Sequence, residues 1–194
     1  MTRILLIQGH PDPAGGHFGH ALAEAYAEGA RAAGHSVDRL EVAGLEFPWL
    51  TSAAEFESGQ PPEAIRAAQR AIEEADHLVF FYPLWLGDMP AILKALLEQV
   101  FRPGFVTEDD KGMGGFGSRR LKGRSARVVV TAGMPAAFYR LIYRAHSLKS
   151  FRRNILRFCG FRPVSTTVIS VNVGGDKARE KWLGKMQRLG RAAR

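Results

Sequence analysis

Apolar residues follow two different spacings along the chain, and the two spacings alternate. Short apolar runs rich in β-branched and aromatic residues predict buried strands. Stretches with apolar residues three and four positions apart predict helices. The predicted strands are residues 3–7, 36–42, 78–82, 125–132 and 164–171. The predicted helices are residues 20–33, 62–75, 91–100, 137–158 and 178–189.

Strands that alternate with helices indicate an α/β fold with a parallel sheet and right-handed crossovers. Five such strands suit the order 2-1-3-4-5, in which the strand order reverses at a switch point between strands 1 and 3. Helices on both faces would make the fold a three-layer sandwich. The chain has 194 residues and no internal repeat, so we expect a single domain over residues 1–194.

The loops at the carboxyl ends of the strands are the expected ligand site, because pockets of open α/β sheets lie there. Loops 9–19 and 82–89 should meet at the switch point, and loop 131–135 should lie beside them. Residues 83–87, PLWLG, are apolar where a loop usually faces water. We therefore expect a flat apolar ligand to cover the second of these loops.

Composition changes this picture little. Apolar content of 46% and charged content of 24% are ordinary for a soluble globular protein. The single cysteine, Cys159, excludes an internal disulfide, and no apolar stretch approaches the roughly 20 residues of a membrane span. Residues 1–9 show no signal-peptide pattern, so these features together predict a cytoplasmic protein.

Charge is distributed unevenly along the chain. Residues 1–139 hold 13 Lys+Arg and 17 Asp+Glu, whereas residues 140–194 hold 14 Lys+Arg and 2 acidic residues. A basic third of a chain is compatible with a solvated surface, with nucleic acid, with a membrane surface or with a phosphorylated dinucleotide. Charge alone does not choose among these partners.

The first loop, 9–19, is rich in small residues and leads into a helix. Backbone N–H groups at a helix amino terminus carry partial positive charge, so this loop could hold a phosphate, with His10 and His17 as further donors. A plain turn between strand and helix is the alternative. We expect no metal site, because His10, His17 and His20 have only Asp12 as a further ligand at the usual spacing.

Residues 103–123 are rich in glycine and charge, and we predict that they form a flap. The G-x-G-x-x-G pattern at residues 112–117 matches a dinucleotide-binding motif, but no predicted strand precedes it and no predicted helix follows. We interpret the match as accidental for that reason. The basic residues of the flap could contact a cofactor phosphate or face solvent; they are Lys111, Arg119, Arg120 and Lys122.

Three aromatic side chains carry candidate chemistry. Trp85, in the second loop, could stack on an aromatic ligand. Tyr139 and His146 are seven residues apart in the predicted helix 137–158, which would place them on about the same face. Both can exchange protons. A hydrogen-bonded helix pair without a catalytic role is the alternative for Tyr139 and His146.

Three blocks of sequence are spread over nearly the whole chain, and each contains residues from one of the three loops and from the helix that follows it. The first block is Gly9-His10-Pro11 with Phe18 and Ala21-Leu22. The second block is Pro83-Leu84-Trp85 and Pro90-Ala91-Ile92-Leu93-Lys94, followed by Glu98 and Val100-Phe101. The third block is Thr131-Ala132-Gly133, then Tyr139, His146 and Phe158-Cys159-Gly160-Phe161. A chain with these blocks resembles the flavodoxin-fold NAD(P)H:quinone oxidoreductase family.

The resemblance implies a flavodoxin-like fold with a flavin bound at the switch point. It implies FMN, with FAD as the alternative, because the chain lacks the C-terminal extension of the larger members. The first loop would hold the phosphate, and the second and third loops would border the isoalloxazine ring. The cofactor-binding residues that the resemblance implies are His10, His17, Phe18, Pro83, Leu84, Trp85, Leu86, Gly87, Thr131, Ala132 and Gly133.

The resemblance also implies an activity. Hydride would pass from NADPH or NADH to the flavin and then to a quinone, in two half-reactions that share one site. A Tyr and a His beside the flavin help to balance charge in the family, and Tyr139 and His146 are the catalytic candidates in this chain. Members of the family are dimers with sites between subunits, so the resemblance implies a homodimer.

Other functions stay open at this point. The same fold could serve as a regulatory flavoprotein subunit of a membrane transporter, with the basic helices from Arg140 onward as its docking face. It could also reduce azo or nitro compounds. A nucleic-acid-binding module that used the same helices would bind no flavin and would lose affinity steeply with salt. We expect a quinone or another small aromatic acceptor, no nucleic acid and no membrane span.

Overall fold

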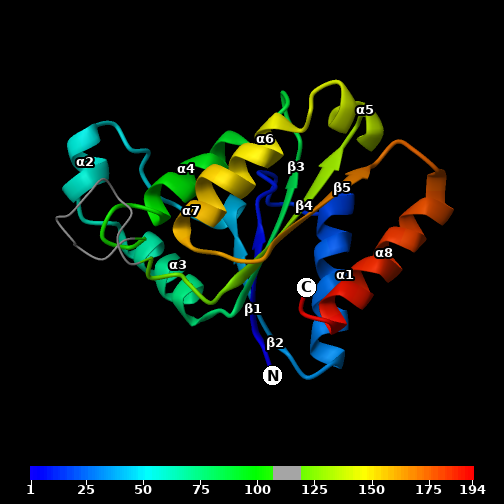
Figure 1. The fold of residues 1–194 in the computed structure, drawn as a ribbon, viewed down its shortest axis with the longest axis horizontal. Helices are drawn as coiled ribbons and strands as arrows, with labels where there is room; N and C mark the ends of the chain where they lie inside the picture. The colour runs from blue at the N-terminus through cyan, green and yellow to red at the C-terminus, as the bar shows by residue number, and fades with distance from the viewer. Residues whose placement is uncertain (107–118) are drawn as a thin grey trace.

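Five parallel strands form one sheet between two layers of helices in the computed structural model, which describes residues 1–106 and 119–194 (Figure 1). The strands are β1 (Arg3–Gln8), β2 (Ser36–Glu41), β3 (His77–Pro83), β4 (Ser125–Ala132) and β5 (Val164–Ser170). Their order is β2-β1-β3-β4-β5, and all four pairings are parallel. The predicted sheet order and strand direction are therefore confirmed.

Burial along the strands explains their sequence patterns. β1, β3 and β4 are buried almost from end to end, because helices cover both faces of the sheet. β2 lies at one edge and is mostly exposed or half-buried. The continuous apolar runs thus mark the central strands, and the alternating run marks an edge strand.

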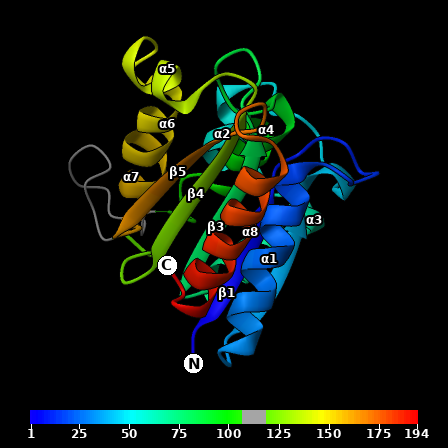
Figure 2. The ribbon, with the colours of Figure 1, turned by 90° about the vertical axis from the view of Figure 1, so that its right-hand side faces the viewer.

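One face of the sheet is covered by α1 (Phe18–Ala32) and α8 (Gly175–Arg191), which lie side by side (Figure 2). The two helices approach closely because Gly29 and Gly190 stand where they cross. A Cβ added to Gly29 would lie 2.1 Å from the backbone oxygen of Gln187, and one added to Gly190 would lie 2.0 Å from that of Tyr26. Only glycine fits these two positions without a shift of backbone.

The other face is covered by α3 (Glu63–Glu74), α4 (Ala91–Val100) and the segment from α6 to α7. Its core contains Leu5, Ile7, Phe80 and Val128, whereas Ile4, Leu6, Val79 and Val129 belong to the core beneath α1 and α8. Neighbouring residues of a strand point to opposite faces, so each central strand supplies both cores.

The long helix predicted over residues 137–158 is wrong. The chain forms α5 (Ala136–Leu141), α6 (His146–Ser150), a π-helical turn (Phe151–Leu156) and α7 (Arg157–Cys159). Arg144 and Ala145 have left-handed backbone, with φ of 52° and 49°, and this breaks the helix between α5 and α6. Tyr139 and His146 therefore do not share one helix face.

The connection 44–61 also contains structure that the sequence pattern did not predict. A 3₁₀ turn occupies Val42–Gly44, and α2 spans Ala53–Ser58. The side chain of Ser52 caps α2 by accepting a hydrogen bond from the backbone N–H of Glu55 at 3.1 Å. The connection is thus a capped helical excursion over the α3 and α4 side of the sheet (Figure 1).

Part of the predicted flap, 103–123, lies outside the described residues, including Lys111 and the glycine pattern at 112–117. Arg119 and Arg120, at the described end, donate to the backbone oxygens of Arg157 and Gly104. Across residues 1–106 and 119–194, no helix combines the length and the apolar character needed to cross a membrane.

Candidate functional site

Three loops start next to one another at the carboxyl edge of the sheet because hydrogen bonds continue the ladder past the strands. The backbone N–H of Gly9 donates to the oxygen of Phe81 at 2.7 Å. Leu84 donates in the same way to Thr131 at 2.7 Å, and Val171 donates to Ala132 at 2.9 Å. The loops after β1, β3 and β4 are therefore held in register around the switch point, where ligands of such sheets bind.

A cavity of about 290 Å³ lies between these loops. Nine of the eleven residues predicted to bind the cofactor line it: His10, His17, Phe18, Pro83, Leu84, Trp85, Thr131, Ala132 and Gly133. Gly19 and Val171 also line it. Neither was among the residues predicted to bind the cofactor, although Gly19 ends the predicted loop 9–19 and Val171 ends the predicted strand 164–171.

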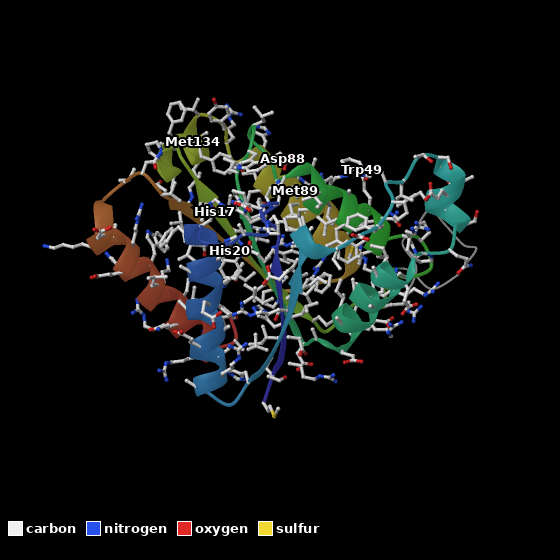
Figure 3. The ribbon with its side chains drawn as sticks, turned by 180° about the vertical axis from the view of Figure 1, so that it is seen from behind. His17, His20, Trp49, Asp88, Met89 and Met134 are labelled. Carbon is white, nitrogen blue, oxygen red and sulfur yellow. The ribbon has the colours of Figure 1, made fainter. Side chains whose placement is uncertain are left out.

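The first loop gathers three histidines at the amino terminus of α1 (Figure 3). The rings of His10 and His17 stack, with centroids 3.9 Å apart, and the ring of His20 lies 5.2 Å from that of His10. His17 Nε2 lies 2.7 Å from a carboxylate oxygen of Asp12. This contact orients His17, and its hydrogen bond is the main reason that the pKa of Asp12 is lowered.

His10 is the most enclosed of the three rings. Its Nδ1 accepts a hydrogen bond from the backbone N–H of Asp12 at 3.1 Å, which leaves the ring proton of the neutral form on Nε2. Burial lowers the pKa of His10, and the nearby His17 and His20 lower it further. An anion beside these rings would oppose both effects, because it stabilises the imidazolium form.

Unpartnered polar atoms at this loop test whether a phosphate fits. Within the described residues, the buried atoms Gln8 Nε2 and His20 Nδ1 have no hydrogen-bond partner. His17 precedes α1 without capping it, and the first turn of α1 holds no acidic residue. The amino-terminal N–H groups of this 15-residue helix thus keep their affinity for an anion. The donor set fits a phosphate group.

The second loop folds back on itself after Trp85. The backbone of Trp85 exchanges hydrogen bonds with that of Asp88 at 2.8 and 2.9 Å, and Leu86 and Gly87 form the turn with φ of 47° and 83°. Leu86 and Gly87 therefore do not line the cavity, unlike the other residues predicted in this loop. Trp85 is half-exposed, and its ring meets that of His10 edge-on at 6.0 Å.

The third loop supplies a tight wall. Thr131 and Ala132 are buried at the end of β4. Gly133 follows them, and its backbone oxygen accepts a hydrogen bond from Asn172 Nδ2 at 3.1 Å. This bond ties the loop after β4 to the loop after β5, so the wall of the cavity is fixed from both sides.

The two predicted catalytic residues lie outside the cavity lining. Tyr139 is buried, its hydroxyl lies 2.8 Å from Ser147 Oγ, and it accepts a hydrogen bond from the backbone N–H of Leu148 at 3.3 Å. His146 is exposed at the start of α6. The structure does not bring the two side chains together, and their catalytic roles stay a prediction.

Comparison with known proteins places this arrangement among relatives. The flavodoxin-like fold family matches residues 2–190. An uncharacterized NAD(P)H oxidoreductase from Haemophilus influenzae is 28% identical over 186 residues, which cover 92% of this chain and 89% of the relative. A ribosyldihydronicotinamide dehydrogenase-like protein from Penicillium crustosum is 28% identical over 155 residues, which cover 68% of this chain but only 57% of the relative.

Among solved structures, the NAD(P)H:quinone oxidoreductase from Methanothermobacter marburgensis superimposes on this chain with a TM-score of 0.81. The two sequences are 27% identical, and the match covers 98% of this chain and 96% of the other. The match thus covers nearly the whole length of both chains.

Proposed function

The chain belongs to the flavodoxin-like fold family, and on this premise we propose that it is a flavin-dependent NAD(P)H oxidoreductase that reduces quinones. One observation carries the proposal. The cavity at the switch point joins a histidine-rich helix amino terminus, suited to a phosphate, to an apolar wall suited to a flat ring. A flavin nucleotide combines these two parts in one molecule.

Each loop then has a distinct task. The amino terminus of α1, His10 and His17 hold the phosphate, and Asp12 fixes the orientation of His17. Pro83, Leu84 and Trp85 exclude water from one side of the ring. When bound, the flavin supplies the hydride chemistry, and the protein supplies position and electrostatics.

We propose FMN as the flavin. A cavity of about 290 Å³ lies just below the usual range of about 300–1,000 Å³ for small-molecule sites, so the mononucleotide suits it better than the larger FAD. The names of relatives support a nicotinamide donor, since the Haemophilus influenzae and Methanothermobacter marburgensis proteins are both called NAD(P)H oxidoreductases. The quinone acceptor is supported by the name of the latter.

We also propose that the protein works as a homodimer. The end of α5 and the residues after it expose a run of apolar side chains: Leu141 is 74% exposed and Ile142 is 66% exposed. Phe138 and Tyr143 are half-exposed beside them. A contiguous apolar face of this kind favours association with a second copy.

Steady-state kinetics test the proposed reaction. If donor and acceptor use one site in turn, varying NADPH at several quinone concentrations should give parallel double-reciprocal lines. Intersecting lines would show that both substrates bind together and would contradict the shared site. Trp85→Ala should weaken FMN binding by about tenfold, the loss of roughly 1.4 kcal/mol of stacking. Trp49→Ala, which removes another exposed indole outside the cavity, is the matched control.

A further inference from the structure

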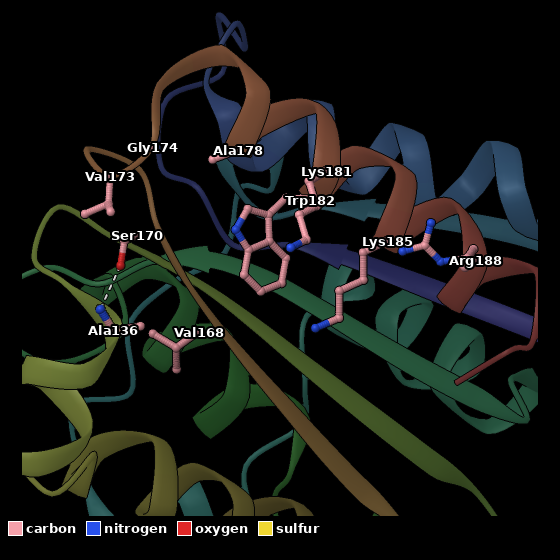
Figure 4. Close-up of a pocket in the computed structure, with 10 residues that line it drawn as sticks. All are labelled: Ala136, Val168, Ser170, Val173, Gly174, Ala178, Lys181, Trp182, Lys185 and Arg188. Carbon is pink, nitrogen blue, oxygen red and sulfur yellow. Dashed lines mark hydrogen bonds between the residues drawn. The ribbon is translucent and has the colours of Figure 1, made fainter.

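A second cavity, of about 470 Å³, lies between α8 and the β5 edge of the sheet (Figure 4). Val168 and Ser170 of β5 form its sheet side, together with Ala136 at the start of α5. Lys181, Trp182, Lys185 and Arg188 extend along its α8 side. The cavity therefore pairs an apolar floor and an indole ring with a row of cations.

Within residues 1–106 and 119–194, no carboxylate forms a salt bridge with the cations of this cavity, which are Lys181, Lys185 and Arg188. The Lys185 ammonium lies 4.5 Å from the centre of the Trp182 ring. Burial lowers the pKa of Lys185, and the charges of Arg127, Arg140 and its neighbours on α8 lower it further. Positive charge is thus concentrated along this side of α8, and no described carboxylate pairs with it.

Arg127, on β4 near Lys185, is a further cation that points independently to an anion-binding site. It is only 8% exposed, and its Nη1 donates to Thr167 Oγ1 at 3.0 Å. Its Nε has no partner, and no carboxylate of the described chain pairs with it. A buried guanidinium without a counter-charge is costly, so an anion bound nearby would stabilise the folded protein.

The second cavity adjoins the proposed flavin site. Ser170 lines the second cavity and the next residue, Val171, lines the first. After β4, Gly133 lines the first cavity, and Ala136, three residues further on, lines the second. From Lys181 to Arg188 the α8 row extends for about 10 Å, at 1.5 Å per residue. A molecule that begins at the flavin ring can therefore continue along α8.

We propose that this cavity binds the adenosine end of NADPH, with the adenine ring against Trp182 and the 2′-phosphate among Lys181, Lys185 and Arg188. The inference rests on the proposed function, because it assigns the other half of the same electron donor. It explains why the unpaired cations stand beside an aromatic ring. It also makes the protein selective for NADPH over NADH, since only NADPH carries the 2′-phosphate.

Binding of nucleotide fragments tests this assignment without any redox reaction. Isothermal titration calorimetry on the full chain should show 2′,5′-ADP binding at least about tenfold more tightly than 5′-AMP, as expected for one phosphate held by charged donors. Combining Lys185→Gln with Arg188→Gln should abolish this difference. Trp182→Ala should weaken both nucleotides alike. Lys177→Gln, also on α8 but outside the cavity lining, should change neither.

The following results distinguish the proposed nucleotide site from the proposed oxidoreductase activity. Equal affinity for 2′,5′-ADP and 5′-AMP in the wild-type chain would overturn the assignment, as would a preference that survives the double substitution. In the same double variant, the ratio of kcat/KM for NADPH to that for NADH should fall by about tenfold. Retention of the 2′,5′-ADP preference by a protein that holds no flavin would refute the proposed oxidoreductase but keep the nucleotide site.

Discussion

The imidazole rings of His10 and His17 stack with their centroids 3.9 Å apart at the amino terminus of α1. Protonation of both rings is unfavourable at this distance because the two positive charges repel each other. Burial makes protonation of His10 less favourable still, and the pKa of His10 is lowered. A phosphate beside the pair would remove this penalty. Flavin binding should therefore be coupled to proton uptake at the first loop.

The coupling predicts a pH dependence of FMN affinity. Without flavin, burial and the neighbouring His17 and His20 lower the pKa of His10 and so favour its neutral form; a bound phosphate raises that pKa. Affinity should thus increase by a few fold as pH falls from about 8 to 6.5, where the phosphate itself stays largely dianionic. Fluorescence titration measures this, and His10→Gln should flatten the curve. The distant His35→Gln is the control, and a flat wild-type curve would contradict the coupling.

The hydrogen bond between Tyr139 and Ser147 allows a matched test of the predicted catalytic tyrosine. Tyr139→Phe and Ser147→Ala both remove this bond; Ser147→Ala should cost about 1 kcal/mol in unfolding free energy, and Tyr139→Phe about 2 kcal/mol, because it also removes the bond from the backbone N–H of Leu148. A proton-donating role for Tyr139 predicts that Tyr139→Phe alone slows flavin reduction, by at least about a hundredfold. Stopped-flow absorbance measures the rate. Equal rates in the two variants, with flavin retained, would reduce Tyr139 to a structural residue.

The glycine contacts between α1 and α8 predict that a glycine-to-alanine substitution lowers the stability of the protein at Gly29 and Gly190 but raises it at Gly184. Gly29→Ala and Gly190→Ala place a methyl group 2.1 and 2.0 Å from backbone oxygens, and each should destabilise the protein by about 3 kcal/mol or more. Gly184→Ala on the same helix meets no atom closer than 3.6 Å. It should raise stability by about 0.5 kcal/mol, because alanine restricts the unfolded chain. Urea unfolding distinguishes the two; destabilisation by Gly184→Ala would contradict the packing argument.

Buried His77 predicts loss of stability in acid. Burial is the main cause that lowers its pKa to about 4, and its Nδ1 contacts Ser125 Oγ at 2.7 Å. The unfolded chain therefore binds more protons between pH 6.5 and 4, so stability should fall as pH decreases through this window, by about 3 kcal/mol in total. His77→Gln should reduce this slope in urea titrations at pH 7, 5 and 4. An unchanged slope would exclude His77 as its source.

The apolar run after α5 predicts how the subunits associate. Leu141→Glu and Ile142→Glu place charge on the proposed interface and should shift the homodimer to monomer, because a buried unpaired charge is costly. Sedimentation velocity reports the change in mass. Trp49→Glu alters an equally exposed apolar residue elsewhere and should leave the dimer intact. A monomeric wild-type protein would contradict the proposal.

The fold could be predicted from sequence because its information is local. Buried runs such as residues 78–82 and the regular alternation with helices determine the strand order through general rules of chain connection. The broken helix could not be predicted, because apolar spacing continues through Arg144 and Ala145 although both have left-handed backbone. Their conformation is set by the loop that they close, and residue type gives no sign of it.

The candidate site, like the fold, could be predicted from the sequence only in part. The sequence located the three loops because each follows a predicted strand, and the cavity gathers nine of the eleven residues predicted to bind the cofactor. It could not distinguish Trp85 from Leu86, since the direction of each side chain depends on the two-residue turn at Leu86 and Gly87. The cations of α8 were visible as charge, but their grouping around one cavity, without a salt bridge to any described carboxylate, appears only in three dimensions.

The most direct test of the account is an absorbance spectrum of the purified protein, loaded with FMN or FAD, desalted, and then mixed with NADPH without oxygen. A flavin site at this cavity predicts a flavin band that survives desalting, more fully with FMN than with FAD, and that NADPH bleaches. A protein that emerges colourless after loading with either flavin would contradict the central claim that the cavity between His10, Trp85 and Thr131 is a flavin site.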